Sequence, residues 1–218
     1  MRPQPNAAYL FMMYVLPGMG ANHAMYPGPW RELAETTFID WPAYRGETTV
    51  RQMAERIVDE RGIKDGALIV GSSFGGMVGC ELAKLVAVRG IVLIGSAKQK
   101  EEVRHLLGWL LPLVDYAPLD LVRRAAGKMP GEMAQVLASA DGPLIRAMSK
   151  AIFTWDGCDD SRGVPVRIHG RRDMVIPCPP AVDLEIDGGH MIAMTHADEC
   201  VSFIRKRFQV PTAARSKP

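Results

Sequence analysis

Short apolar runs separated by helix-like stretches are the feature that most constrains how this chain can fold. Most of the runs are continuous and rich in Val, Ile and Leu, as expected for parallel strands that are covered on both faces. The six runs span residues 10–16, 38–41, 67–70, 91–94, 164–168 and 182–186. Their alternation with helices predicts a three-layer α/β/α sandwich with a mostly parallel sheet of about six strands.

The helices between these runs carry terminal signals. The clearest begins after Thr48 and Thr49 and repeats apolar residues at helical spacing. Thr49 and Gln52 fit a capping box, and Gly62 fits a C-terminal stop. Two further helices are predicted over about residues 75–86 and 197–208.

The alternation is interrupted between residues 97 and 162. This interval has no strand-like run, but it has many apolar residues at helical spacing, divided by prolines at 112, 118, 130 and 143. It predicts a helical cap, with residues 1–96 and 163–218 forming the core. The alternative is an extra crossover with extended loops, for which the interval is too long and too apolar.

Composition narrows the class of partner. The 218 residues carry a formal net charge of +2, and the basic residues are dispersed, which argues against nucleic acid as a partner. Residues 7–16 imitate a signal peptide, but a buried strand is the favoured interpretation, since cleavage would delete a strand that the pattern requires. No other segment is apolar enough to span a membrane, so we expect a small-molecule partner.

The spacing of the cysteines indicates the redox compartment of the protein and whether it binds a metal. Cys80, Cys158, Cys178 and Cys200 form no C-x-x-C pair, and none has a histidine at metal-ligand spacing. Four isolated thiols indicate a reducing compartment, so we expect a cytoplasmic protein. Cys80 and Cys200 fall on apolar-periodic helices, where we expect small buried hydrophobes. We expect no metal and no organic cofactor.

Residues 71–75 read Gly-Ser-Ser-Phe-Gly, directly after an apolar run and directly before a helix-like stretch. This context predicts a nucleophile elbow, in which a sharp strand-to-helix turn exposes the hydroxyl of Ser73. The flanking glycines allow neighbouring backbone to approach closely. The positive end of the following helix would face the reacting centre.

A serine hydroxyl needs a base, and the base needs an orienting acid. Asp173 follows the predicted strand 164–168, and His190 follows the predicted strand 182–186. Loops at the carboxyl ends of parallel strands share one edge of the sheet, so we expect Ser73, Asp173 and His190 to meet there. Asp187 is a rival acid, but its place three residues before His190 is a poor geometry for orienting the ring.

These motifs, in this order, resemble the α/β-hydrolase superfamily, and the resemblance covers residues 9–208. It implies Ser73 as nucleophile, His190 as general base and then acid, and Asp173 as the orienting acid. It also implies an oxyanion hole from the backbone N–H groups of Met19 and Phe74. It further implies a serine hydrolase of carboxylic esters, with thioesters next.

The chain departs from the family pattern in two ways. Pro17 stands where many members have histidine in the loop that carries Met19, which weakens that assignment. We also expect the first two strands of the family fold to be missing, because only about eight residues precede the first apolar run. The expected fold is therefore an α/β-hydrolase sheet that lacks its first strands.

The remaining candidates are residues that would contact substrate or support the site. We expect contacts from His23, Trp109 and Met191, with a solvated loop residue as the alternative for His23. Other apolar cap residues would line an acyl pocket. His169 is expected to pack or hydrogen-bond beneath the acid loop, and His196 to lie on the final helix.

Two alternatives belong to other function classes. The first is a non-catalytic protein of the same fold that binds a small molecule. The second is an NAD(P)-dependent oxidoreductase, suggested by Gly18 and Gly20 after a strand and Asp40 about twenty residues later. Pro27 and Pro29 argue against it, because they interrupt the helix that would receive the pyrophosphate.

Overall fold

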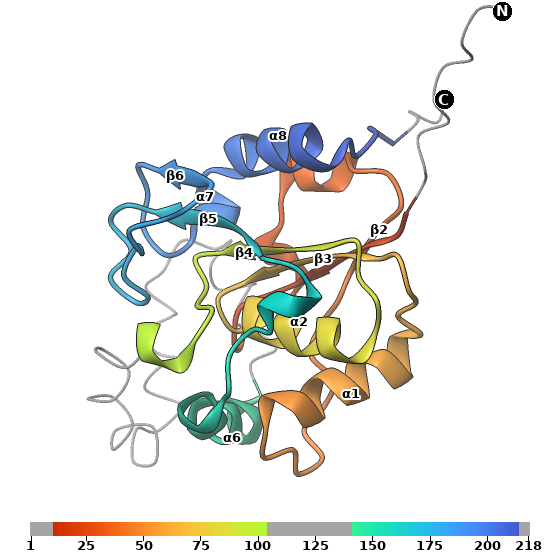
Figure 1. Cartoon of the computed structure of the whole chain (residues 1–218), viewed down its shortest axis with the longest axis vertical. Coiled ribbons are helices and arrows are strands. Elements are labelled where there is room, and N and C mark those ends of the chain that lie inside the picture. Colours follow the sequence, from red (N-terminus) through yellow and green to blue (C-terminus); the bar gives the residue numbers. More distant parts are fainter. Residues whose placement is uncertain (1–10, 104–140, 214–218) are drawn as a thin grey trace, which may run out of the picture.

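The computed structural model of the chain describes residues 11–103 and 141–213 (Figure 1). Within them, a six-stranded sheet has the order β2-β1-β3-β4-β5-β6, and every pair of neighbouring strands is parallel. The strands are β1 (Met13–Leu16), β2 (Thr36–Phe38), β3 (Leu68–Ser72), β4 (Gly90–Ile94), β5 (Val166–Gly170) and β6 (Leu184–Ile186). The predicted parallel sheet of six strands is confirmed.

One strand lies earlier in the chain than its apolar run indicated. The run at residues 38–41 predicted the second strand, but β2 ends at Phe38. Trp41 instead lies in the following loop, where its indole N–H donates to the Gly18 carbonyl at 2.9 Å. Trp41 is partly buried by this contact between loops, so its apolar character made the predicted strand too long at its C-terminal end.

Helices cover both faces of the sheet (Figure 1). The α-helices are α1 (Val50–Arg61), α2 (Phe74–Leu85), α6 (Gly142–Ala151), α7 (Ile192–Thr195) and α8 (Ala197–Phe208). One core cluster joins α1, α2 and α6 to one face, and a second joins α7 and α8 to the other. This is the predicted three-layer arrangement, and all five residues of β3 and β5 are buried between the layers.

The signals at the ends of α1 act nearly as predicted. The Thr49 hydroxyl accepts the Gln52 N–H at 3.1 Å, and Gly62 ends the helix in the left-handed conformation with φ of 60°. The reciprocal bond of the capping box is displaced by one residue, because the Gln52 side chain accepts from the Thr48 N–H. The final helix, α8, spans the predicted residues, and His196 is its N-cap.

The expectation of four free thiols is wrong. Cys80 of α2 and Cys158 form a disulfide, with Cα atoms 4.9 Å apart although 78 positions separate them in the chain. Cys200 is buried and Cys178 is partly exposed, and both are free. The pairing depends on how the fold brings Cys158, which lies before β5 in the chain, back against α2, and cysteine spacing does not reveal this. The argument for a reducing compartment therefore loses its basis.

In the described part of the interval 97–162, the regular elements are all helical. It contains α6 and three 3-10 turns, namely Lys100–Glu102, Ile152–Thr154 and Asp160–Arg162. Residues 104–140, which include Trp109, lie outside the described residues, so a cap with boundaries at 97 and 162 stays a prediction. No helix in the described ranges is long and apolar enough to cross a membrane.

Candidate active site

Ser73 occupies the turn between β3 and α2, with φ of 51° and ψ of −123°. A side chain at Gly71 would overlap the backbone of Gly75, and one at Gly75 would overlap the carbonyls of Leu16 and Pro17. Both flanking glycines are therefore required by close backbone approach, as the elbow interpretation predicted. The turn leaves Ser73 at the carboxyl edge of the sheet.

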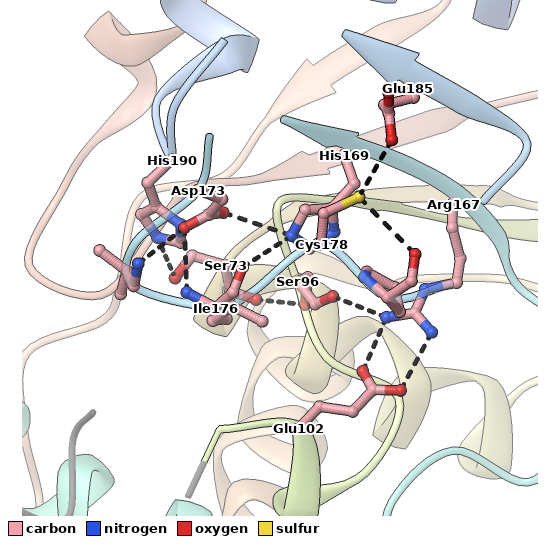
Figure 2. Close-up of polar contacts among 12 residues, drawn as sticks. Ser73, Ser96, Glu102, Arg167, His169, Asp173, Ile176, Cys178, Glu185 and His190 are labelled. Atoms are coloured by element: carbon pink, nitrogen blue, oxygen red, sulfur yellow. Dashed lines mark hydrogen bonds and ion pairs between the residues drawn. The ribbon is translucent and has the colours of Figure 1, made fainter. Parts of the chain in front are cut away.

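The structure brings Ser73, His190 and Asp173 into one hydrogen-bonded line (Figure 2). His190 Nε2 lies 3.0 Å from Ser73 Oγ, and His190 Nδ1 lies 2.8 Å from Asp173 Oδ2. The Asp173 side chain is fully buried, whereas that of His190 is 17% exposed. The base is thus open to a substrate, while the acid is sealed beneath it.

The loops that carry the acid and the base touch each other directly. A side chain at Gly170, the last residue of β5, would overlap the carbonyl of Gly189. The Arg172 N–H donates to the Gly188 carbonyl at 2.9 Å. These backbone contacts set the separation between Asp173 and His190.

The Asp173 carboxylate has donors at both oxygens. Oδ1 accepts the N–H groups of Val175 and Ile176 at 2.8 and 2.9 Å, and Oδ2 faces His190 and His169. Burial raises the pKa of this carboxyl, but the hydrogen bonds from His169, His190 and Ile176 outweigh burial and hold the pKa below its usual range. Asp173 is therefore ionised at neutral pH.

His169 lies beneath the acid loop, as predicted. It is 1% exposed, and its Nε2 lies 2.8 Å from the Ile176 carbonyl and 3.3 Å from Asp173 Oδ2. The rival acid Asp187 is exposed and pairs with Arg171 and Arg172 instead of His190. The structure therefore favours Asp173 over Asp187 as the partner of His190.

The two residues expected to supply oxyanion donors flank the nucleophile. Phe74 is the first residue of α2, so its N–H stands at the positive end of that helix. Met19 follows Gly18, and a Cβ at Gly18 would lie 3.6 Å from Ser73 Cβ, so the loop after β1 lies against the serine. Trp41 anchors this loop through the Gly18 carbonyl.

Two of the residues expected to contact substrate, His23 and Met191, are held by contacts with residues outside the triad. His23 is half exposed, with its Nδ1 2.7 Å from Asp40 Oδ2 and its carbonyl bound by Arg31. Met191 follows His190 and packs partly buried against the core beside α7. Trp109 lies outside the described residues.

Several residues around the site escaped sequence analysis. Gly95 has φ of 52°, and a Cβ there would lie 3.0 Å from the His190 carbonyl and 3.4 Å from Asp173 Oδ2. Ser96 donates its hydroxyl to the Ser73 carbonyl at 2.6 Å, and Arg167 forms an ion pair with Glu102. Their signal in the sequence is slight: a Gly-Ser pair directly after β4, and a charged residue inside an apolar strand.

The alternative of a dinucleotide-binding oxidoreductase requires a helix that the described chain lacks after β1. After β1, the described chain has 3-10 turns at His23–Met25 and Gly28–Glu32 before β2, where a pyrophosphate site needs a long helix. Within the described ranges, no group of three or more His, Cys, Asp or Glu side chains is arranged to hold a metal ion.

Comparison with known proteins identifies a family. A sequence profile described as "Alpha/beta hydrolase family" matches residues 13–203, which is most of the chain. No curated protein sequence matches the chain significantly.

Three of the similar solved structures illustrate the range of relatives. A thermophilic esterase from Thermogutta terrifontis has 16% identity and a TM-score of 0.64, over 91% of this chain and 89% of that one. An enol-lactonase from Burkholderia xenovorans LB400 has 18% identity and a TM-score of 0.65, over 94% and 93%. A type II thioesterase from the yersiniabactin biosynthetic pathway has 17% identity and a TM-score of 0.60, over 95% and 96%. At these identities the likeness shows the fold alone.

Proposed function

The chain belongs to the alpha/beta hydrolase family, and from this premise we propose that it is a serine hydrolase of small-molecule carboxylic esters, with thioesters as the next candidates. The observation that carries the proposal is the hydrogen-bonded line from Ser73 Oγ through His190 to Asp173, with distances of 3.0 and 2.8 Å. A hydroxyl, an imidazole and a buried carboxylate in this order are the parts of a nucleophilic triad. The esterase, lactonase and thioesterase among its structural relatives are consistent with this reaction class.

The proposed reaction has two halves. Ser73 Oγ attacks the substrate carbonyl carbon while His190 Nε2 takes the hydroxyl proton, and the ionised Asp173 stabilises the imidazolium through Nδ1. The tetrahedral intermediate collapses to an acyl-enzyme, and His190 gives its proton to the departing alcohol or thiol. A water then attacks the acyl-enzyme, His190 takes its proton and returns it to Ser73 Oγ, and the carboxylic acid leaves.

The N–H groups of Phe74 and Met19 are the proposed oxyanion donors. The positive end of α2 supports the first, and the contact between Gly18 and Ser73 keeps the second nearby. One donor of this kind is worth about 3–4 kcal/mol in the transition state. The second donor lies in the loop that carries Pro17.

The space for the substrate would extend from this loop. A cavity of about 350 Å³ beside it has mostly apolar walls that also include three polar residues. It is lined by Gly20, Ala21, Asn22, Asp40, Trp41, Pro42, Ala43, Asp141 and Leu144. We propose that it receives part of an apolar acyl or alcohol group. Met191, His23 and Trp109 remain the candidates for further substrate contacts.

Fluorophosphonate labelling followed by peptide mass spectrometry tests the nucleophile. We expect one adduct, on Ser73, and a Ser73→Ala variant that neither labels nor hydrolyses 4-nitrophenyl butyrate. We expect Asp173→Asn to lower kcat about 10⁴-fold, whereas Asp187→Asn, the matched control, keeps wild-type kcat. Ester hydrolysis that survives unchanged in Ser73→Ala would refute the proposal and favour a binding protein of the same fold.

A substrate panel then tests the scissile bond and the pocket. Matched esters and thioesters of two to twelve acyl carbons would be compared by kcat/KM. We expect turnover of both classes, with an optimum in acyl length. A flat response across lengths would contradict the apolar pocket but leave the labelling result untouched.

A further inference from the structure

The backbone of Ser73 is held in an unusual conformation. A φ of 51° with a ψ of −123° is rare for a residue with a side chain and costs of the order of 1–3 kcal/mol. Such a conformation persists only where its surroundings hold it. The Ser73 N–H donates to the Ile94 carbonyl at 3.0 Å, and the Ser73 carbonyl accepts two hydrogen bonds.

Ser96 supplies the shorter of those two bonds. Its hydroxyl donates to the Ser73 carbonyl at 2.6 Å, and the Gly76 N–H donates to the same oxygen at 3.0 Å. Ser96 is fully buried, and a side chain at Gly76 would overlap its hydroxyl. Gly76 thus keeps open the space that the Ser96 hydroxyl occupies.

The peptide group that receives this bond also carries the candidate oxyanion donor. The carbonyl of Ser73 and the N–H of Phe74 belong to one planar trans peptide unit, so they point in opposite directions. Fixing the carbonyl therefore fixes the direction of the N–H. A hydrogen bond to the carbonyl also polarises the unit and strengthens the N–H as a donor.

Ser96 is itself held by a partly buried ion pair (Figure 2). Arg167 Nη2 donates to the Ser96 carbonyl at 3.3 Å, and Nη1 and Nη2 donate to the two carboxylate oxygens of Glu102 at 3.0 and 2.7 Å. The Arg167 side chain is only 9% exposed, and its Nε has no partner among the described residues. The guanidinium is therefore oriented by Glu102 and Ser96, even though this leaves one of its donors unused.

We propose that Ser96 is a positioning residue that orients and polarises the peptide between Ser73 and Phe74 for oxyanion stabilisation, and that Arg167 and Glu102 hold Ser96 in place. This rests on the proposed serine hydrolase function and adds to it residues that touch no substrate. Ser96 acts on the transition state more than on the bound substrate, because the charge that it helps to stabilise develops only there.

Kinetics with a transition-state analogue test this role. We expect Ser96→Ala to lower kcat for 4-nitrophenyl butyrate about 10- to 100-fold with KM within about twofold, since one donor is misdirected but not removed. The inhibition constant of a trifluoromethyl ketone, which forms a charged adduct with serine, should weaken by the same factor as kcat/KM. Rates are expressed per serine labelled by fluorophosphonate at saturation, and thermal unfolding is followed in parallel.

A second set of variants probes the ion pair. We expect Arg167→Met to lower kcat about 3- to 10-fold, and Arg167→Lys, which keeps a charged donor, to recover part of that loss. Arg56→Met is the matched control: Arg56 of α1 is a similarly buried arginine that pairs with Glu47 and with Glu60 of the same helix. It also donates to the Ala43 carbonyl, but it bonds neither the triad nor Ser96 or Glu102. This variant should lower the unfolding temperature without changing kcat per labelled serine.

The outcomes separate this inference from the proposed function. If the wild-type protein hydrolyses esters while Ser96→Ala and Arg167→Met keep its kcat and its inhibition constant, the positioning role is refuted and the function stands. If the wild type neither labels nor hydrolyses, the proposed function fails. Crystal structures of the two variants then decide about positioning: a rotated peptide between Ser73 and Phe74 supports the role, and an unchanged peptide in both overturns it.

Discussion

The elbow around Ser73 and the returning segment, residues 141–162, which lead back to the sheet at β5, are held in place largely by different means. At the elbow, missing side chains matter most, because Gly71 and Gly75 let backbone meet backbone. The returning segment is fixed mainly by the side chains that it places against the core, including a disulfide to Cys80 and a hydrogen bond from Trp155 to Glu81. It also has one close backbone approach, at Gly157, where a Cβ would lie 2.8 Å from the Lys98 carbonyl. Both regions fasten to α2, the elbow at its first turn and the returning segment further along.

This difference separates two kinds of sensitivity. A fold region built on close backbone approach has no room for an added atom, so it responds to almost any substitution. A region built on side-chain contacts loses only the contact that is removed. The following variants break each region in turn, from the largest expected effect to the smallest.

Adding a methyl group at the elbow should have the largest effect. We expect Gly75→Ala to destabilise the protein by about 3 kcal/mol or more, or to prevent folding, because the new methyl overlaps two backbone carbonyls that cannot move aside. Denaturant unfolding and the yield of folded protein measure this. Gly79→Ala on the same helix is the control, since its methyl meets only side chains, those of Ile69 at 3.0 Å and Ile91 at 3.9 Å. Equal stability of the two variants would contradict the backbone argument.

Removing the disulfide should cost less. We expect the double variant Cys80→Ala with Cys158→Ala to lose about 2–4 kcal/mol of unfolding free energy, because its unfolded chain is no longer cross-linked. The elbow should survive, so kcat per labelled serine stays near the wild-type value. Cys178→Ala, at a free thiol, is the control. Dithiothreitol should lower the stability of the wild type and of the Cys178 variant alike, and an unchanged wild type in reductant would be evidence against the bond.

Charge gives a third comparison, between Asp173 beside the elbow and Asp159 in the returning segment. The pKa of Asp173 is lowered in the folded protein, so the unfolded chain takes up the proton at a higher pH than the folded one. Its stabilising contribution is complete above about pH 5 and is lost as the pH falls through about 4 and below.

The measurement is urea unfolding between pH 3 and pH 6. Wild type should lose of the order of 1 kcal/mol more than Asp173→Asn over this range, since the variant has no carboxylate there to protonate. The pKa of Asp159 is also lowered, by hydrogen bonds from Ser161, but that side chain is exposed to solvent. Asp159→Asn should therefore follow the wild-type acid profile, and a profile as flat as that of Asp173→Asn would disprove the distinction.

Two indole N–H groups provide the finest comparison. Trp155 donates to Glu81 Oε1 at 2.8 Å, and Trp41 donates to the Gly18 carbonyl at 2.9 Å in the loop beside Ser73. We expect each change to Phe to cost about 1 kcal/mol of stability. Only Trp41→Phe should also lower kcat, by about 3- to 10-fold, because that loop lies against the nucleophile. Equal kcat values in the two variants would contradict the expectation that only the loop beside Ser73 affects catalysis.

Sequence reasoning succeeded where the controlling contacts are local. The six strands, the Thr49 cap and the Gly62 stop were all predicted, because apolar periodicity and capping chemistry act within a few residues. The meeting of Ser73, Asp173 and His190 was predicted by one topological rule, since each follows a parallel strand. Their catalytic roles stay a prediction.

Sequence reasoning failed where the contacting residues are distant from each other in the chain. The disulfide to Cys158, the Glu102–Arg167 ion pair and the bond from Ser96 to the Ser73 carbonyl each join different elements. The end of β2 was misplaced because Trp41 is held by a contact with the loop after β1, so its apolar character says nothing about strand pairing.

The contact between Gly170 and Gly189 has a consequence for engineering this protein. The loops after β5 and β6 contact each other through their backbones, so Asp173 and His190 are positioned together as one structural unit. Ser73 lies in a separate unit, the turn between β3 and α2. Replacing only one of these loops with a longer loop from a related protein would move Asp173 and His190 apart. Loop grafts meant to change substrate preference should therefore carry both loops together, or leave both untouched.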